Sequence, residues 1–281
     1  LLFPASQVTQ LRAALQRHGL KLDTNFAPVD AIWSDRPSLP ACPAFIHEDK
    51  YAGRSAVEKI ARILDEVKLQ GAGSLLVSDL AEVAWTLNIR SRDVNCNPVA
   101  YAFLYLSPEG NTLFIKEDKI TPEVADALAA ANVSVAPYDS VIPFLSSLPA
   151  SATVLYEGAR VAARLVDALG DRAVAGASPI PLLKAVKNST QIAGIRNAME
   201  KDGAALVGAF MEIERRLREG EGLTELAVAD ILTEYRSKQD LYFDESFETI
   251  AGYGPHGAIV HYSATPETSS DIHPQGLLLI D

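Results

Sequence analysis

The chain has 281 residues, of which 48% are hydrophobic and 22% charged, and its formal net charge is −11 at pH 7. This composition excludes a disordered chain, and the acidic balance without a long basic run argues against a nucleic-acid partner. No apolar stretch approaches the roughly 20 residues that cross a bilayer, so we expect no membrane partner. Cys42 and Cys96 lie far apart without ligand spacing, which indicates reduced thiols in a cytoplasmic protein.

The first 45 residues show one amphipathic helix and one proline-rich segment. Val8, Leu11 and Leu15 recur at helical spacing, which predicts a helix over residues 5–18. Four prolines over residues 28–43 predict an irregular linker, because proline fixes φ and removes a hydrogen-bond donor. The helix has no companion upstream. We therefore expect residues 1–45 to be the tail of a first domain and a linker, within a longer polypeptide.

Residues 46–186 alternate between helical and strand patterns. Helices are predicted over 55–68, 79–88, from 121, and over 139–147 and 159–169, with strands near 74–78, 101–106, 112–116, 133–137 and 153–156. Asp79 and Thr121 are typical helix caps, and Pro122 suits the first helical position. This order predicts an α/β domain with mostly crossover connections.

Residues 187–281 follow a different order, with helices first and strands after them. The apolar stripe over 184–219 predicts one or two long helices, bent or broken near Gly203 or Gly208. Thr224 begins another helix that runs to about residue 238, and Glu225 suits its positive end. Strands are predicted near 247–251 and 277–280. The change of order places a domain boundary near Val186.

Three of the five histidines, His256, His261 and His273, fall in the last 26 residues. His256 and His273 lie in turns and polar loops, where a solvated side chain is the simpler interpretation. His261 ends the apolar run 258–260, which favours a partly buried, oriented ring of the kind that functional sites use. Taken alone, His261 is also compatible with a structural role.

Asp281 ends the apolar run 277–280, and a carboxylate at the end of a strand is a common metal ligand. A helix cap or turn residue is an equally simple interpretation, because one aspartate shows no ligand group. Asp244 and Glu245 are adjacent, so on a strand they point to opposite faces, and we expect them to be solvated. No phosphate-binding loop, dinucleotide fingerprint or nucleophile elbow is present.

Six segments, in chain order, resemble the three-domain aminopeptidase P (Xaa-Pro aminopeptidase) family of pita-bread metallopeptidases. They are IWSDRPSLP (32–40), YAGRSAVEKI (51–60), AEVAWTLNIRSRDVNCNPVAYAFL (81–104), KAVKNSTQIAGIRNAMEKDGAAL (184–206), SFETIAGYGPHGAIVHY (246–262) and LLLID (277–281). The resemblance implies an α/β domain like the creatinase and aminopeptidase P N-terminal domain over 46–186. The beginning of a pita-bread α+β catalytic domain follows over 187–281.

The resemblance also implies functional roles. His261 matches a histidine that lines the substrate site and handles charge or protons near the scissile bond, and Asp281 matches the first metal-binding aspartate. The family uses two divalent metal ions, usually Mn²⁺, to release the N-terminal residue of peptides with proline second. It is typically homodimeric. The partners are thus a proline-containing peptide and a second copy of the chain.

The sequence departs from the family at some positions. His256 stands where asparagine is usual, and Ser91 and Arg92 replace a glycine and a small residue. The other metal ligands of the family lie beyond Asp281, so we expect residues 1–281 alone to be inactive. The alternative is a catalytically dead homologue that serves as a peptide- or protein-binding scaffold, since fold alone does not fix function.

Overall fold

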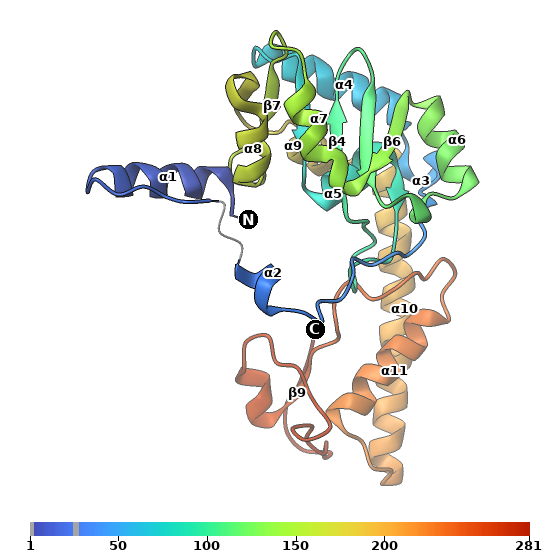
Figure 1. The fold of residues 1–281 in the computed structure, drawn as a ribbon. Helices are drawn as coiled ribbons and strands as arrows, with labels where there is room; N and C mark the ends of the chain where they lie inside the picture. The colour runs from blue at the N-terminus through green and yellow to red at the C-terminus, as the bar shows by residue number, and fades with distance from the viewer. Residues whose placement is uncertain (1–2, 25–27) are drawn as a thin grey trace. The chain divides into compact units, whose positions relative to one another are not determined.

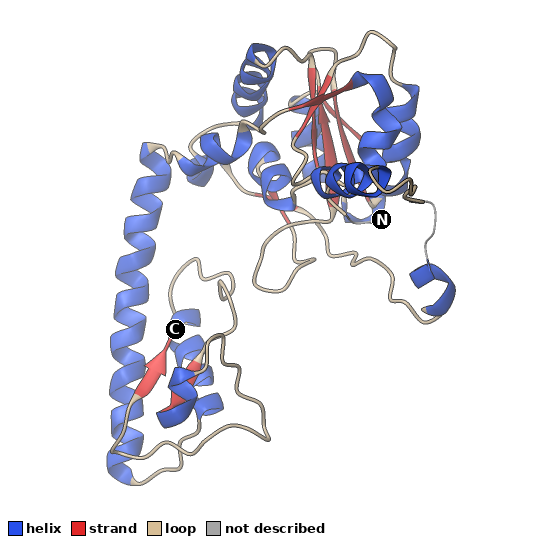
Figure 2. Cartoon of the chain, turned by 90° about the vertical axis from the view of Figure 1, so that its left-hand side faces the viewer, coloured by secondary structure: helices blue, strands red, loops and turns tan. Residues whose placement is uncertain are grey.

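The computed structural model describes residues 3–24 and 28–281. The chain divides into two compact units (Figures 1 and 2). The first contains the chain up to Val94 together with Pro98–Thr190, and the second contains Asn95–Asn97 and Gln191–Asp281. Among the helices of the described residues, none combines the length and apolar character needed to cross a membrane.

The first unit is built on a six-stranded mixed sheet in the order β6-β5-β4-β2-β7-β8. Its strands are β2 (Ser74–Val77), β4 (Ala102–Leu106), β5 (Asn111–Ile115), β6 (Val133–Pro137), β7 (Val154–Tyr156) and β8 (Ala173–Ala175). Strand β4 runs antiparallel to both of its neighbours, while β5–β6, β2–β7 and β7–β8 are parallel pairs. The predicted crossover connections therefore occur at β5–β6 and β7–β8, whereas β4 and β5 form a hairpin.

Helices cover both faces of this sheet (Figure 1). They are α3 (Asp49–Ala52), α4 (Ala56–Leu69), α5 (Leu80–Leu87), α6 (Pro122–Ala130), α7 (Val141–Ser147), α8 (Ala163–Leu169) and α9 (Ile180–Ala185). Helices α4, α5, α6 and α9 pack on one face, and α7 and α8 pack on the other. A short pair, β1 (Phe45–Ile46) and β3 (Ile89–Arg90), lies outside the main sheet.

The two-sided covering follows from the strand sequences. In β2, Leu75 and Val77 belong to the cluster under α4 and α5, while Leu76 belongs to the cluster under α7 and α8. A strand buried on both faces reads as a continuous apolar run, as β2 does. Each fully buried side chain of this size contributes about 1.5–3 kcal/mol. The predicted α/β class is confirmed.

The helix starts predicted from the caps Asp79 and Thr121 are also confirmed, because capping is a local property, whereas the helix predicted from residue 159 begins at Ala163. Asp79 accepts a hydrogen bond from the Glu82 N–H, and Thr121 accepts one from the Val124 N–H. Ser55, which the sequence placed within its helix, caps α4 in a capping box with Glu58. Asn88 ends α5 in the left-handed conformation.

The N-terminal region differs from its prediction in one respect. Helix α1 (Ala5–Gln16) is present as expected, and Val8 packs with Ala163 of α8. The proline-rich segment is not wholly irregular, because it contains the short helix α2 (Pro28–Ile32). Proline at the first position of a helix loses no hydrogen bond, which reconciles this helix with the composition of the segment.

Ser91 has a defined contact at a position where the family that the sequence resembles usually has glycine. Its side chain is fully buried, and its hydroxyl donates a hydrogen bond to the Cys42 carbonyl at 3.0 Å. The hydroxyl therefore ties the segment before β1 to the end of β3. Both Cys42 and Cys96 are free thiols in the structure.

His47 gives the first unit a specific pH dependence. Burial, together with the positive charges of Arg90 and Lys59, lowers the pKa of His47 from 6.5 to about 4. The unfolded chain therefore binds more protons between these values, so stability falls as pH falls from 6.5 towards 4. We expect the free energy of unfolding to fall less for His47→Gln than for the wild type when the pH is lowered from about 7 to about 5. Urea unfolding at the two pH values measures this difference. An equal loss in both proteins would contradict the assignment.

The second unit contains two helices, a 3₁₀ turn and a two-stranded antiparallel sheet. They are α10 (Ser189–Glu219), α11 (Glu225–Ser237), β9 (Ala251–Tyr253), η4 (Gly254–Ala258) and β10 (Leu278–Ile280). Ala209 and Ile213 of α10 pack with Val228 and Leu232 of α11 and with Ala251 of β9. The cap at Thr224 is confirmed by its hydrogen bond from the Ala227 N–H.

One of the two alternatives predicted for the long helix is confirmed, and the predicted start of the first strand is wrong. Helix α10 is a single continuous helix, with no break at Gly203 or Gly208. A Cβ at Gly208 would lie 2.6 Å from the ring of Tyr235, so this glycine allows α10 and α11 to approach closely. The first strand begins at Ala251 rather than near Phe247, because Phe247 lies in an irregular segment and is 46% exposed.

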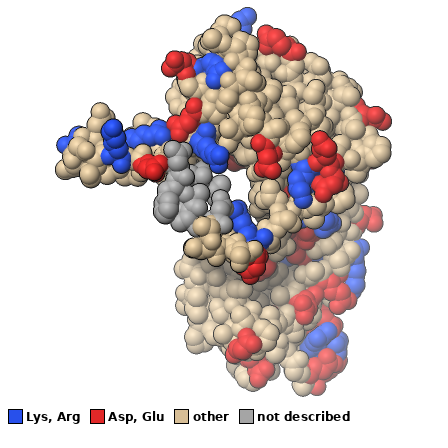
Figure 3. Space-filling model, in the orientation of Figure 1, with Lys and Arg blue, Asp and Glu red and all other residues tan. Residues whose placement is uncertain are grey.

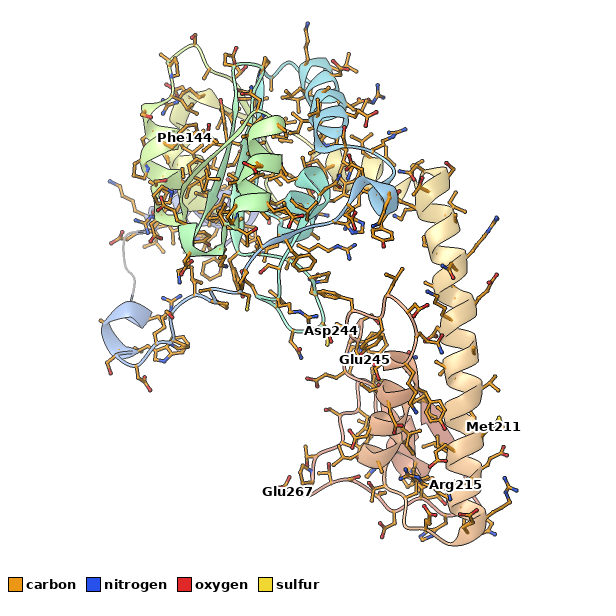
Figure 4. The ribbon with its side chains drawn as sticks, turned by 90° about the vertical axis from the view of Figure 1, so that its right-hand side faces the viewer. Phe144, Met211, Arg215, Asp244, Glu245 and Glu267 are labelled. Atoms are coloured by element: carbon orange, nitrogen blue, oxygen red, sulfur yellow. The ribbon has the colours of Figure 1, made fainter. Side chains whose placement is uncertain are left out.

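The apolar stripe of α10 is only partly covered. Leu206, Ile213 and Leu217 pack on the core of the second unit, whereas Met199 and Phe210 are exposed. Met211 is 65% exposed and lies on the outer side of the helix (Figure 4). The hydrophobic pattern thus overstates how much of the helix is buried here. On the molecular face of Figure 3, acidic and basic side chains are interspersed.

Candidate metal-ligand and substrate segment

Asp281 follows β10, the strand that pairs with β9. Its backbone is fixed by two 2.9 Å hydrogen bonds with Ile250, one donated by each residue. Its side chain is exposed to solvent. The sequence therefore correctly placed Asp281 at the end of a strand, and the structure presents its carboxylate on a backbone of fixed position.

His261 lies in a turn eight residues after β9 and has a backbone φ of 55°. This left-handed conformation is uncommon for a residue with a Cβ and occurs most often in tight turns. The prediction of a partly buried ring is wrong, because His261 is exposed and the preceding Val260 is 83% exposed. The apolar run 258–260 does not form a strand, since η4 and the turn occupy this stretch. In the described part of the chain, no hydrogen bond or ion pair joins His261 to Asp281.

The turn that carries His261 is attached to a buried carboxylate. Glu225, the first residue of α11, has no exposed surface. Its carboxylate accepts hydrogen bonds from the backbone N–H groups of Tyr253 at 2.6 Å and Ser270 at 2.9 Å. It also accepts one from the Tyr262 hydroxyl at 2.8 Å, next to His261 in the chain.

His256 completes this network. Its Nδ1 lies 3.0 and 3.1 Å from the two carboxylate oxygens of Glu225, and its ring stacks on Tyr262 with centroids 4.6 Å apart. The expectation of a solvated turn residue is therefore wrong, since only 26% of the His256 side chain is exposed. With Nδ1 protonated, the imidazole donates to the carboxylate, and its face stacks on the ring of Tyr262.

The electrostatics of Glu225 follow from these contacts. Burial raises its pKa, but the hydrogen bonds from Tyr253, Ser270, Tyr262 and His256 outweigh burial, and the net pKa lies below the ordinary value. The positive end of α11 acts in the same direction. The pKa of the Tyr262 hydroxyl is raised by its burial and by the bond to Glu225. The carboxylate is thus the charged acceptor of the network.

Sequence reasoning missed this network. Thr224 and Glu225 were identifiable as the start of a helix, but the partners of Glu225 lie 28–45 residues further along the chain. The one local signal was the substitution at His256, where the family usually has asparagine. When a residue differs from the one that a family usually has beside a functional motif, it is worth looking for a new side-chain contact of that residue.

The adjacent carboxylates Asp244 and Glu245 lie in the loop after α11 (Figure 4). Glu245 is not simply solvated, because it accepts from Arg236 at 3.2 Å and from the Tyr242 hydroxyl at 3.1 Å. Arg236 also binds Asp202 of α10 at 2.8 Å. These contacts tie the loop to both helices, which gives Glu245 a structural role.

The described residues supply one candidate metal ligand and not a complete set. Within 3–24 and 28–281, no three His, Cys, Asp or Glu side chains form a group suited to a metal ion. Asp281 offers hard oxygen donors at an accessible strand end, which fits a divalent cation of the magnesium or manganese class. A metal pair at Asp281 requires further ligands from other residues.

Comparisons with known proteins assign the two parts of the chain. Residues 35–191 match the creatinase/prolidase N-terminal domain, and residues 193–281 match metallopeptidase family M24. The first match alone covers more than half of the chain. The chain therefore belongs to the creatinase/prolidase family and carries its N-terminal domain followed by a segment of the M24 metallopeptidase type.

Curated relatives and one solved structure are similar to this chain over its whole length. Aminopeptidase P2 from Arabidopsis thaliana is 33% identical over 314 residues, which cover 100% of this chain and 44% of the relative. A probable Xaa-Pro aminopeptidase P from Neosartorya fischeri is 35% identical over 293 residues, covering 100% and 45%. The crystal structure of X-prolyl aminopeptidase from Caenorhabditis elegans, described as a cytosolic enzyme with a di-nuclear active site, superposes with a TM-score of 0.92 at 26% identity, covering 100% and 47%. The chain thus spans less than half the length of these relatives.

Proposed function

We propose that the chain is part of a metal-dependent aminopeptidase that releases the N-terminal residue from peptides with proline at the second position. The observation that carries the proposal is the match of the complete chain to aminopeptidases of this type, with His261 and Asp281 in the last matched segment. The bond before proline is a tertiary amide without an N–H group, which calls for a dedicated site.

In this proposal Asp281 ligates one of two divalent metal ions, and Mn²⁺ is the proposed metal. When bound, such a pair activates a water molecule and stabilises the charge that develops on the attacked carbonyl. Because the Asp281 backbone is held by Ile250, its carboxylate needs little ordering to bind a cation. The exposed imidazole of His261 can donate or accept a hydrogen bond at the substrate, according to its tautomer.

We further propose a cytoplasmic homodimer, with residues 1–45 as the tail of a first domain, 46–186 as the second domain and 187–281 as the start of the catalytic domain. A cytoplasmic location is supported by the two free thiols and by the description of the Caenorhabditis elegans protein as cytosolic. Residues 1–281 alone are expected to be inactive, because one ligand does not hold a metal pair.

The test uses the full-length product of the gene from which these residues come. Purified with Mn²⁺, it is expected to release the first residue of an Xaa-Pro peptide. The same peptide with alanine in place of proline serves as the matched control and is expected to react much more slowly. A folded protein without hydrolysis of either peptide would refute the enzyme and favour the scaffold alternative.

A further inference from the structure

The Glu225 carboxylate is arranged to hold one particular turn. Its donors come from both sides of residues 254–261: Tyr253 lies immediately before this stretch and Tyr262 immediately after it. His256, within the stretch, is the third donor. One buried side chain therefore fixes both ends and the middle of the segment that carries His261.

Further hydrogen bonds around Glu225 restrict the position of its carboxylate. The Glu225 N–H donates to the Ser270 carbonyl at 3.2 Å, and the Ser270 N–H returns a bond to the carboxylate at 2.9 Å. Thr224 bridges to Asp271 next to them. A carboxylate has about four acceptor positions, and the donors of Tyr253, His256, Tyr262 and Ser270 fill them.

Tyr262 transmits this constraint to the neighbouring imidazole. The tyrosine is 8% exposed and its ring is covered by His256, whereas His261 is exposed. His261 precedes Tyr262 directly and has a left-handed backbone with a φ of 55°, so a fixed Tyr262 side chain limits where the His261 ring can lie. The buried tyrosine acts as the anchor and the histidine as the presented group.

We propose that Glu225 is a positioning residue for His261 and acts on it through Tyr262 and the His256-containing turn. The inference rests on the proposed function, since the role of His261 is part of that proposal. Because Glu225 has no exposed surface, its role is not direct contact with the substrate. Its contribution is to reduce the number of arrangements that the His261 ring samples, and a displacement of about 1 Å at a reacting group costs on the order of 10²-fold in rate.

The test uses the full-length protein with two test variants and one control variant. Glu225→Gln keeps the size of the side chain but replaces an acceptor oxygen by a donor, which opposes the donors around it. Tyr262→Phe removes one hydrogen bond and keeps the ring, so it serves as the milder variant if Glu225→Gln does not fold. Glu234→Gln is the matched control, because Glu234 lies on the same helix in an exposed pair with Lys238.

The first readout is hydrogen exchange of the metal-free protein. We expect Glu225→Gln, and to a smaller extent Tyr262→Phe, to speed exchange of the amides in 253–262 by about tenfold or more, with α10 unchanged. Glu234→Gln is expected to match the wild type. Unchanged exchange of this segment in both variants would overturn the proposal. This readout tests whether Glu225 holds the turn, and it does so even if the full-length protein is not a peptidase.

The second readout is a double-mutant cycle with His261→Ala. If Glu225 acts through His261, Glu225→Gln lowers kcat/KM by about 10–100-fold in the wild type but by less than about threefold when His261 is already alanine. A merely structural role for Glu225 would give the same factor in both backgrounds and would overturn the proposal. Absence of Xaa-Pro peptidase activity in the wild-type protein would instead refute the proposed function.

Discussion

Replacing Lys119 by methionine is expected to destabilise the first unit by about 3–5 kcal/mol. The Lys119 ammonium pairs with the Asp93 carboxylate, and both side chains have no exposed surface. Asp93 also accepts from the Tyr101 N–H at 2.8 Å, while its second oxygen has no partner among the described residues. Methionine fills a similar volume but leaves the carboxylate buried without its cation, and the cost of that uncompensated charge dominates the loss.

Urea unfolding of the wild type and the variant measures this effect. Arg62→Met is the matched control, since Arg62 pairs with Glu66 at 2.5 Å on the exposed side of α4 and is expected to cost less than about 1 kcal/mol. The double variant Asp93→Asn/Lys119→Met is expected to recover much of the loss, because no charge remains buried. A Lys119→Met effect as small as that of Arg62→Met would contradict the buried pair.

The buried pair illustrates what the sequence indicates and what it does not. Asp93 falls within a family motif, yet its partner is 26 residues away and could not be identified from spacing. Helix caps such as Asp79 and Thr224 were identifiable because the donor lies three residues from the acceptor. The alternation of helices and strands predicted the α/β class, but the antiparallel pairing of β4 with β2 joins segments that are distant in the chain.

In the candidate site, too, local features were predictable from the sequence and long-range contacts were not. The strand that ends at Asp281 was predictable from a local apolar run, and its pairing with β9 was not. His261 was expected to be partly buried because apolar residues precede it, but the turn exposes both Val260 and the imidazole. The Glu225 network was missed because its four donors are brought together only by the packing of α11 against β9 and the turn after it.

Asp281→Asn in the full-length protein is expected to cause the largest loss of activity, on the order of 10³-fold in kcat/KM for an Xaa-Pro peptide. Asparagine keeps one neutral oxygen donor but removes the charge and the second oxygen, so the variant binds its cation more weakly. Metal ions contribute several kcal/mol of transition-state stabilisation, and each 1.36 kcal/mol corresponds to about tenfold in rate. Bound metal per polypeptide after dialysis, measured beside kcat/KM, shows whether activity falls because the metal is lost.

A measurement of thermal stability distinguishes the loss of metal binding from misfolding of the variant. The Asp281 side chain is exposed and its two bonds with Ile250 are made by the backbone, so the substitution is expected to leave the thermal unfolding of the metal-free protein unchanged. Asp271→Asn is the matched control, because Asp271 is also exposed and lies ten residues earlier, and it is expected to keep its metal. If Asp281→Asn retains metal and activity to the same extent as Asp271→Asn, the carboxylate at the end of β10 is an ordinary surface acid and the metal assignment is wrong.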